Sequence, residues 1–329
     1  MKPKVVSQDP VKPWFETLET MGEFIGIRYG RVDPQSDEVQ WVYRPHKEFD
    51  GIGGFADILR ERGIDLAPLP KITHPSPPSW LPLIKSVPNY LKPRKVLTWG
   101  AIKRGEPVTE IGPPPAVGWH VFSEEDTFKI RQASRAQGVT VNSFLMKHLD
   151  RAIRPALSDP SEAIPWMVPV NLRGKIAQAR DSANHSSYVA IKINSYDSAR
   201  DVHNSIHRRL RKGEHWANWK SYELTRSLPE DRKRALIDSF RAMSQWSIGS
   251  FSNLGVWDQE CAVREEYCSA PWLFAPPVLR CQLLGAGCVT WQNRLSLTIQ
   301  AHPDLSTSED LAAFWIYRWF SEINFSLPK

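Results

Sequence analysis

The order of predicted strands and helices constrains the fold of this chain more than any other feature. Residues 23–31 and 39–44 predict two strands joined by a turn. In the second strand, Val39, Trp41 and Tyr43 follow the two-residue period of a half-buried strand. Helices and further strands then follow in mixed order. We therefore expect an α/β protein with mixed α and β layers.

The later segments repeat this mixture. A glycine-rich helix start follows Asp50, with Phe55, Ile58 and Leu59 on one face and Gly63 as a plausible stop. Further helices are predicted at residues 123–138, 140–156, 198–213, 227–243 and 308–323. Further strands are predicted at residues 167–173, 188–193 and 246–255, with two more inside 278–300. The sequence shows no internal repeat.

A stiff segment divides the chain. With 329 residues it is too long for one small core, and Gly-Pro-Pro-Pro at 112–115 has no structural period. We expect a shortened N-terminal lobe at 1–113 and a C-terminal lobe at 114–329. Residues 64–95 are dense in proline and predict an irregular loop, and residues 97–102 predict one more strand.

The composition is that of an ordinary globular protein, with 41% apolar and 24% charged residues. No apolar run is long enough to span a membrane, and the first 15 residues contain no apolar signal core, so we expect a cytoplasmic protein. The formal net charge of +6 fits a solvated surface. It also fits phosphorylated or acidic partners. No aromatic-interleaved basic motif indicates nucleic-acid binding.

Cysteine and tryptophan usage gives two further expectations. Six, twelve and six residues separate Cys261, Cys268, Cys281 and Cys288, whereas structural zinc sites pair ligands two to four residues apart. We expect buried thiols rather than a metal site or a disulfide framework. The 14 tryptophans fit either a tryptophan-rich core or a tunnel lined by tryptophan.

The segment Pro45-His46-Lys47-Glu48-Phe49-Asp50-Gly51 is the main candidate for chemistry. His46 follows a predicted strand and precedes a helix. A histidine has a pKa near neutrality, which suits a general base that takes a proton from an alcohol or amine. The plainer alternatives are a solvated loop histidine, and for Asp50 a turn or helix-cap residue.

This segment resembles the HHxxxDG motif of the superfamily that contains chloramphenicol acetyltransferase and condensation domains. His46 occupies the position of the catalytic histidine, and Asp50 and Gly51 match the aspartate and glycine. Pro45 replaces the first histidine. Three further segments resemble superfamily motifs in the same order, over roughly residues 23–325: 138–153 (GVTVNSFLMKHLDRAI), 168–174 (VPVNLRG) and 250–255 (SFSNLG).

The resemblance implies two lobes of the chloramphenicol acetyltransferase type, with a tunnel between them that holds the active site. It implies transfer of an acyl group from a thioester donor to a hydroxyl or amine, with His46 as general base. It implies that Asp50 pairs with Arg173 and so fixes the loop that carries His46. Gly51 is implied to have a structural role in the same loop. Ser252 and Asn253 are the implied substrate-binding residues.

The implied co-substrate is an acyl thioester of coenzyme A or phosphopantetheine, with no tightly bound cofactor and no metal. The implied partners are a small-molecule acceptor and an acyl or peptidyl carrier protein. The oligomeric state is left open. The basic run His207–Lys212 is either a solvated helix face or a contact for a carrier or for coenzyme A phosphates.

Two other functions remain open. Pro45 and the short first lobe fit a degenerate member that binds an acyl chain or carrier without turnover, and a hydrolase or cyclase would use the same His46. Asn253 also fits an Asx-type turn, and Asn171 is expected to support the loop of Arg173. His148 fits a core histidine, and His185 lies in a loop with no matching catalytic position.

Overall fold

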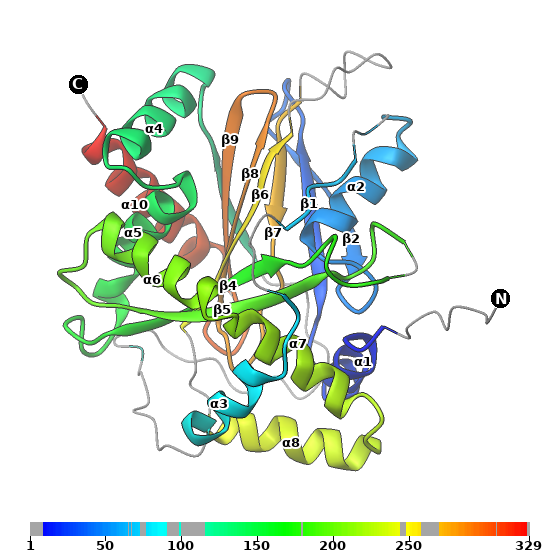
Figure 1. Ribbon diagram of the computed structural model, residues 1–329. Coiled ribbons are helices and arrows are strands. Elements are labelled where there is room, and N and C mark those ends of the chain that lie inside the picture. Colours follow the sequence, from blue (N-terminus) through cyan, green and yellow to red (C-terminus); the bar gives the residue numbers. More distant parts are fainter. Residues whose placement is uncertain are drawn as a thin grey trace.

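Two β-sheets organise the part of the chain that the structure describes (Figure 1). The computed structural model describes residues 9–64, 66, 68–72, 77–90, 99, 116–178, 180–243, 248–257, 270–306 and 308–327. A three-stranded sheet has the order β2-β1-β7, and a six-stranded sheet has the order β3-β9-β8-β6-β4-β5. The predicted mixed α/β class is confirmed, with two lobes that each have a sheet.

The small sheet carries the candidate motif. β1 (Gly26–Val32) pairs antiparallel with β2 (Val39–Pro45) and with β7 (Trp272–Ala275). The helix α2 (Gly51–Glu61) packs on this sheet through buried Phe55, Ile58 and Leu59, as its apolar spacing predicted. Since β7 comes from the C-terminal part of the chain, the small sheet is completed across the predicted lobe boundary.

The strands of the large sheet pair along their length on one side of the sheet, whereas two strands diverge on the other side. It contains β3 (Val117–Val121), β4 (Ile164–Asn171), β5 (Ser186–Ile193), β6 (Gly249–Trp257), β8 (Leu284–Trp291) and β9 (Arg294–Ala301). β8 is buried along its whole length between β6 and β9. Within the described residues, β4 and β6 pair only at Trp166–Gly249 and Met167–Ser250. Beyond these pairs the two strands diverge (Figure 1).

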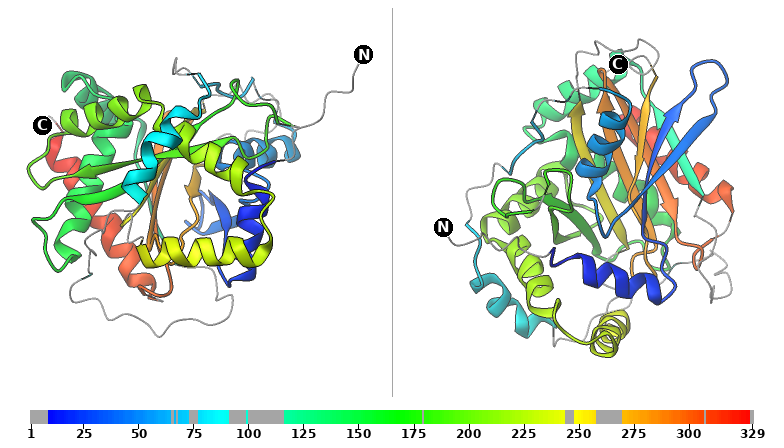
Figure 2. Two further views of the ribbon diagram at one scale, coloured as in Figure 1. Left: turned by 60° about the horizontal axis from the view of Figure 1, so that its bottom comes forward. Right: turned by 90° about the vertical axis from the view of Figure 1, so that its right-hand side faces the viewer.

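Four long helices cover one face of the large sheet (Figures 1 and 2). They are α4 (Glu124–Ala136), α5 (Val141–Ile153), which continues into the 3-10 turn η1 (Arg154–Ala156), α6 (Ala199–Arg211) and α10 (Glu309–Ser326). Ser123, Thr140 and Ser198 cap the N-termini of α4, α5 and α6 through their hydroxyl groups. All four helices match predicted segments.

A second group of helices lies at the other end of the molecule (Figure 1). It contains α1 (Lys12–Thr20), α3 (Leu81–Tyr90), α7 (Glu214–Thr225) and α8 (Glu230–Met243). α3 packs against α7, and α1 packs against α8. α8 matches a predicted helix, whereas α1, α7, β3 and β7 had no counterpart among the predicted elements.

The prediction of an irregular loop over residues 64–95 is wrong at α3. Proline is tolerated in the first turn of a helix, where its missing N–H has no intrahelical acceptor, and Pro82 occupies that turn. The hydroxyl of Ser79 accepts a hydrogen bond from the backbone N–H of Leu81 at 3.2 Å. Pro82 is therefore compatible with the start of this helix.

Some predictions fall outside the described residues. These are the boundary near residue 113, Cys261, Cys268 and all of the strand at 97–102 except Trp99. Cys281 is half-buried, whereas Cys288 is a buried free thiol whose pKa is raised by its burial. None of the helices in the described parts of the chain is apolar enough over a sufficient length to cross a membrane.

Candidate active site

His46 lies on a turn between β2 and α2. Its backbone N–H donates to the carbonyl oxygen of Ile25 at 3.1 Å, which continues the pairing of β2 with the start of β1. The carbonyl oxygen of Pro45 accepts from the backbone N–H groups of Glu48 and Phe49 and closes the turn. Pro45 therefore ends the strand at a position where its missing N–H is not needed.

The imidazole of His46 has a defined orientation. Nδ1 lies 2.8 Å from the carbonyl oxygen of Phe49, which only accepts, so Nδ1 carries the proton and donates it. Within the described residues, Nε2 makes no hydrogen bond. The ring packs against Phe15 of α1, with 4.5 Å between ring centroids. Burial lowers the pKa of His46, so the ring is neutral near pH 7 and Nε2 has a lone pair.

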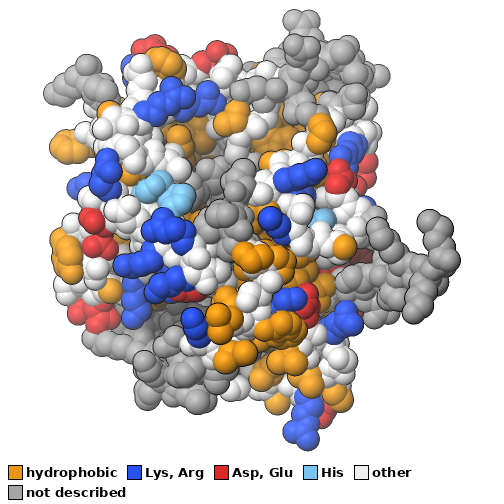
Figure 3. Space-filling view, in the orientation of Figure 1, with side chains coloured by type: hydrophobic (Ala, Val, Ile, Leu, Met, Phe, Trp, Pro, Cys, Tyr) orange, Lys and Arg blue, Asp and Glu red, His pale blue; other side chains and the backbone are white. Residues whose placement is uncertain are grey.

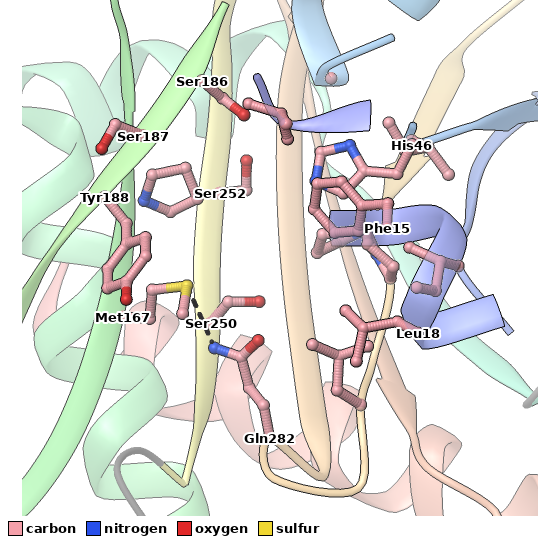
Figure 4. Close-up of a pocket in the computed structure, with 18 of the residues that line it drawn as sticks. Phe15, Leu18, His46, Met167, Ser186, Ser187, Tyr188, Ser250, Ser252 and Gln282 are labelled. Atoms are coloured by element: carbon pink, nitrogen blue, oxygen red, sulfur yellow. Dashed lines mark hydrogen bonds between the residues drawn. The ribbon is translucent and has the colours of Figure 1, made fainter. Parts of the chain in front are cut away.

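The ring of His46 faces a cavity between the two sheets (Figure 4). The cavity has a volume of about 130 Å³. One wall comes from α1 and β1 and includes Phe15, Leu18 and Ile27, whereas the opposite wall comes from β4, β5 and β6. This position between two lobes agrees with the predicted fold.

Asp50 connects three parts of this site and is buried. Its Oδ1 accepts from the backbone N–H of Gly53 at 2.7 Å, which caps α2. The same oxygen accepts from Nη2 of Arg173 at 2.8 Å, while Oδ2 accepts from Nη1 of Arg173 and from the backbone N–H of His185, both at 2.8 Å. The cap and the ion pair, which were alternatives in the sequence, are thus both present.

Arg173 uses its remaining donors on the same loop. Nε donates to the carbonyl oxygen of Asp181 at 2.7 Å, and Nη2 also donates to that of Ala183 at 3.1 Å. Asn171 accepts from the backbone N–H of Arg173 at 3.0 Å, as expected for a residue that supports this loop. The predicted ion pair between Asp50 and Arg173 is confirmed as a buried, bidentate ion pair.

Two glycines allow α2 to approach its neighbours closely. A Cβ at Gly53 would lie 2.0 Å from the carbonyl oxygen of Ser182, which is incompatible with the present backbone positions. A Cβ at Gly51, which lines the cavity, would lie 2.7 Å from a methyl group of Leu254. Close packing, rather than positive φ, therefore explains both glycines.

Asn184 is a site residue that the sequence did not indicate. It is fully buried, and its Nδ2 donates to the backbone carbonyl of His46 at 2.7 Å. Its Oδ1 accepts from the hydroxyl of Ser186 at 2.8 Å, and Ser186 lines the cavity. The loop has no period or motif that singles out Asn184, because its role depends on a tertiary contact over 138 positions.

The two substrate-binding candidates on β6 face opposite sides. Ser252 lines the cavity of His46, together with Ser250 (Figure 4). Asn253 instead lines a second cavity of about 310 Å³ on the helix-covered face of the large sheet. Its Oδ1 accepts from the backbone N–H of Gly255 at 2.8 Å, which is the Asx-type turn considered above.

The second cavity has a more polar lining. Thr140, Asn142, Asn171, Lys71 and His207 contribute to it, and Pro169 of β4 lines both cavities. Basic side chains gather on the surface over α6 (Figure 3), whose last turn contains Arg208, Arg209 and Arg211.

Two other histidines lie outside the cavity. His148 is buried in α5 with its ring against Phe144, and burial lowers its pKa to about 4, with Arg151 and Lys147 adding to the effect. It is therefore a core histidine, as expected. His185 is buried behind Asp50 and donates from Nε2 to the carbonyl oxygen of Arg180 at 3.0 Å.

Comparison with solved structures shows that the fold is similar to those of a cyclization–docking bidomain, an O-acetyltransferase and a condensation domain. The cyclization–docking bidomain of EpoB from Sorangium cellulosum has a TM-score of 0.57 at 10% identity, covering 88% of this chain and 61% of that one. TRI3 trichothecene 15-O-acetyltransferase from Fusarium sporotrichioides has a TM-score of 0.53 at 12% identity, covering 96% of this chain and 75% of that one.

The starter condensation domain of rhizomide synthetase RzmA, in complex with C8-CoA and Leu-SNAC, has a TM-score of 0.52 at 11% identity. This match covers 87% of our chain and 66% of that one. The chain thus spans less than two thirds of the EpoB and RzmA structures. No protein-family model and no curated protein sequence matches the chain. The likeness is therefore one of fold, and the motif assignment stays a prediction.

Proposed function

We propose that the protein is an acyltransferase that moves an acyl group from a thioester donor to a hydroxyl or amine acceptor, with His46 as general base. The observation that carries this proposal is the state of His46. It is a neutral imidazole with Nδ1 hydrogen-bonded to the carbonyl oxygen of Phe49 and Nε2 without a partner among the described residues, beside a cavity between two lobes. We place the lobe boundary near residue 113.

The proposed reaction needs one proton acceptor and no protein nucleophile. Nε2 of His46 takes the proton from the acceptor while its oxygen or nitrogen bonds to the thioester carbonyl carbon. The carbon–sulfur bond then breaks, and the departing thiolate takes the proton back from His46. Ser252 is our candidate donor to the carbonyl oxygen as charge develops there, because its side chain lines the same cavity.

Asp50 is excluded as the base by its contacts. Both carboxylate oxygens accept hydrogen bonds from charged or backbone donors, which occupy their lone pairs. Its proposed role, with Arg173, is to hold the turn that carries His46.

We further propose that the donor arm approaches through the second cavity. β4 and β6 diverge beyond Met167 and Ser250, and Pro169 lines the cavities on both sides of this fork. Lys71 and the basic face of α6 offer cations for the phosphates of coenzyme A or of a carrier protein's phosphopantetheine. A fold neighbour that was crystallised with an acyl-CoA supports a donor of this kind.

The test is a screen of acyl-CoA and carrier-bound thioesters against alcohols and amines, read by mass spectrometry beside His46→Ala. A new ester or amide that depends on His46 supports the proposal. Thiol release without a transfer product indicates a hydrolase instead. Thioester binding without turnover by the wild-type protein indicates the degenerate binder that Pro45 suggested.

A further inference from the structure

We infer that the group bound beside His46 is a short, uncharged acyl chain, and that Leu18 and Gln282 set its maximum length. This inference rests on the proposed function and names its substrate class. Three features of the cavity support it: the charge of its lining, its volume and the residues at the end away from His46.

The lining has no charge to pair with a charged substrate. Apart from His46, none of the described side chains that line the cavity is acidic or basic. A carboxylate on the acyl chain would lose water without gaining a cation, which is strongly unfavourable. If it paired with His46, it would favour the protonated imidazole and remove the base. The chemistry of the wall therefore selects against dicarboxylic acyl groups.

An apolar wall fits a hydrocarbon chain. Phe15 and Leu18 of α1 and Ile25 and Ile27 on the β1 side give this part of the lining an apolar surface. The donor arm that we place beyond Pro169 would direct its acyl end between this surface and Ser250 on β6 (Figure 4).

The volume limits the chain to a few carbons. An apolar cavity of about 150 Å³ in a protein core accommodates benzene, which has six heavy atoms. The cavity beside His46 has about 130 Å³. By this comparison it holds roughly four to six heavy atoms without rearrangement. An acetyl group would leave space unfilled, and a chain of ten carbons would exceed this volume.

Leu18 and Gln282 line the end of the cavity that lies away from the base. In Figure 4, His46, Ser186 and Ser252 lie toward one end, whereas Leu18 and Gln282 lie toward the other. Nε2 of Gln282 donates to the sulfur of Met167 at 3.3 Å. This hydrogen bond orients the Gln282 side chain at the end of the cavity away from His46. Leu18 is itself buried. Shortening either side chain should lengthen the cavity without touching His46.

The first experiment measures kcat/KM by thiol release for saturated acyl-CoA donors from acetyl to hexadecanoyl, with an acceptor from the screen above. We expect a maximum at about four to six carbons and a fall of about tenfold or more by ten carbons. Succinyl-CoA is compared with its uncharged isostere, 4-methylpentanoyl-CoA. We expect succinyl-CoA to be poorer by on the order of 100-fold or more.

Three variants test whether the named residues set the length. Leu18→Ala and Gln282→Ala should move the maximum to longer chains, and Ser250→Leu should move it toward acetyl by filling the cavity. Leu145→Ala, at a core position that does not line the cavity, controls for destabilisation alone and should keep the wild-type profile. Partial unfolding cannot move the preferred chain length upward in the enlarged cavities and downward in the filled one.

Binding measurements separate this inference from the proposed function. The same length and charge series is made as unreactive S-(2-oxoalkyl)-CoA thioethers, and their Kd values are measured by calorimetry. If the Kd values follow the expected order of length and charge but no thioester is turned over, the inference is supported and catalysis is refuted. A flat length profile, equal use of succinyl-CoA, or no binding of any analogue would overturn the inference, whether or not turnover occurs.

Discussion

The carboxylate of Asp50 and the guanidinium of Arg173 meet through two hydrogen bonds of 2.8 Å, although the residues are 123 positions apart. Asp50 starts α2 directly after the turn of His46, and Arg173 follows β4 of the large sheet. The pair therefore ties the turn that carries the candidate base to the other lobe. Because both partners are buried, removing one would leave the other charge without compensation.

We expect Asp50→Ala to lower the free energy of unfolding by on the order of 3–5 kcal/mol and to reduce activity at the same time. Arg173→Ala should have a similar effect. The double variant should be less destabilised than the sum of the two, because neither charge is then left alone. Urea unfolding of the four proteins measures this coupling.

The exposed pair Arg60–Asp181 provides a matched control. It is also a close arginine–aspartate contact between α2 and the loop that follows β4, but its side chains are 40% and 51% exposed. Asp181→Ala should cost less than about 1 kcal/mol, since surface ion pairs contribute little. Strict additivity of Asp50→Ala and Arg173→Ala would show that the buried pair does not act as a unit.

We expect His46→Ala to reduce turnover by about 100-fold or more, as for the loss of a general base. Its stability should change by about 1 kcal/mol or less, since the side chain is half-buried and has one short hydrogen bond, to Phe49, besides a long contact of 3.5 Å with Nδ2 of Asn184. His120→Ala is the control, because His120 is also half-buried but packs on Phe320 of α10, outside the cavity. Full activity in His46→Ala would refute the mechanism.

The pH profile gives an independent test of His46. Only the neutral ring accepts a proton, so kcat/KM should fall as the pH drops through its pKa. Burial lowers that pKa, and the acid limb should therefore have its midpoint below 6.5, the ordinary value for histidine. Initial rates with buffers from pH 4 to 8 measure the midpoint. A midpoint above 6.5 would contradict a base in this environment.

Features that depend on local sequence were predictable. The apolar face of α2 and the capping residue Ser123 each follow from neighbouring residues, and the structure has both. The strand β2 also forms, but its predicted two-residue period is wrong, because Tyr43 is exposed and Val42 packs against the core. The ion pair of Asp50 with Arg173 was predictable for another reason, namely that two segments resembled paired motifs of a known superfamily.

Features that depend on tertiary contacts were not predictable. Asn184 touches His46 only because the loop before β5 folds back onto the turn. The short strand β7 has four residues, and its pairing with β1 joins segments more than 200 positions apart. The separation of Ser252 from Asn253 depends on which side of β6 faces the cavity, and this follows from the sheet order rather than from the local motif.

His148 predicts how the stability of the whole fold depends on pH. Burial in α5, with nearby Arg151 and Lys147, lowers its pKa from 6.5 to about 4. Between these values the unfolded chain binds a proton that the folded protein does not. The free energy of unfolding should therefore fall as the pH drops from 6.5 to about 4, and this group should cause no further loss below that range.

The magnitude follows from the two pKa values. A difference of about 2.5 corresponds to about 3 kcal/mol of stability lost through His148 alone. His148→Leu places an apolar side chain of similar size against Phe144. Leucine has no titratable group, so it binds no proton. The variant should lose about 3 kcal/mol less than the wild type between pH 7 and pH 4, as measured by urea unfolding at each pH. Parallel stability curves for the two proteins would mean that His148 titrates normally in the fold and is not the buried neutral residue described above.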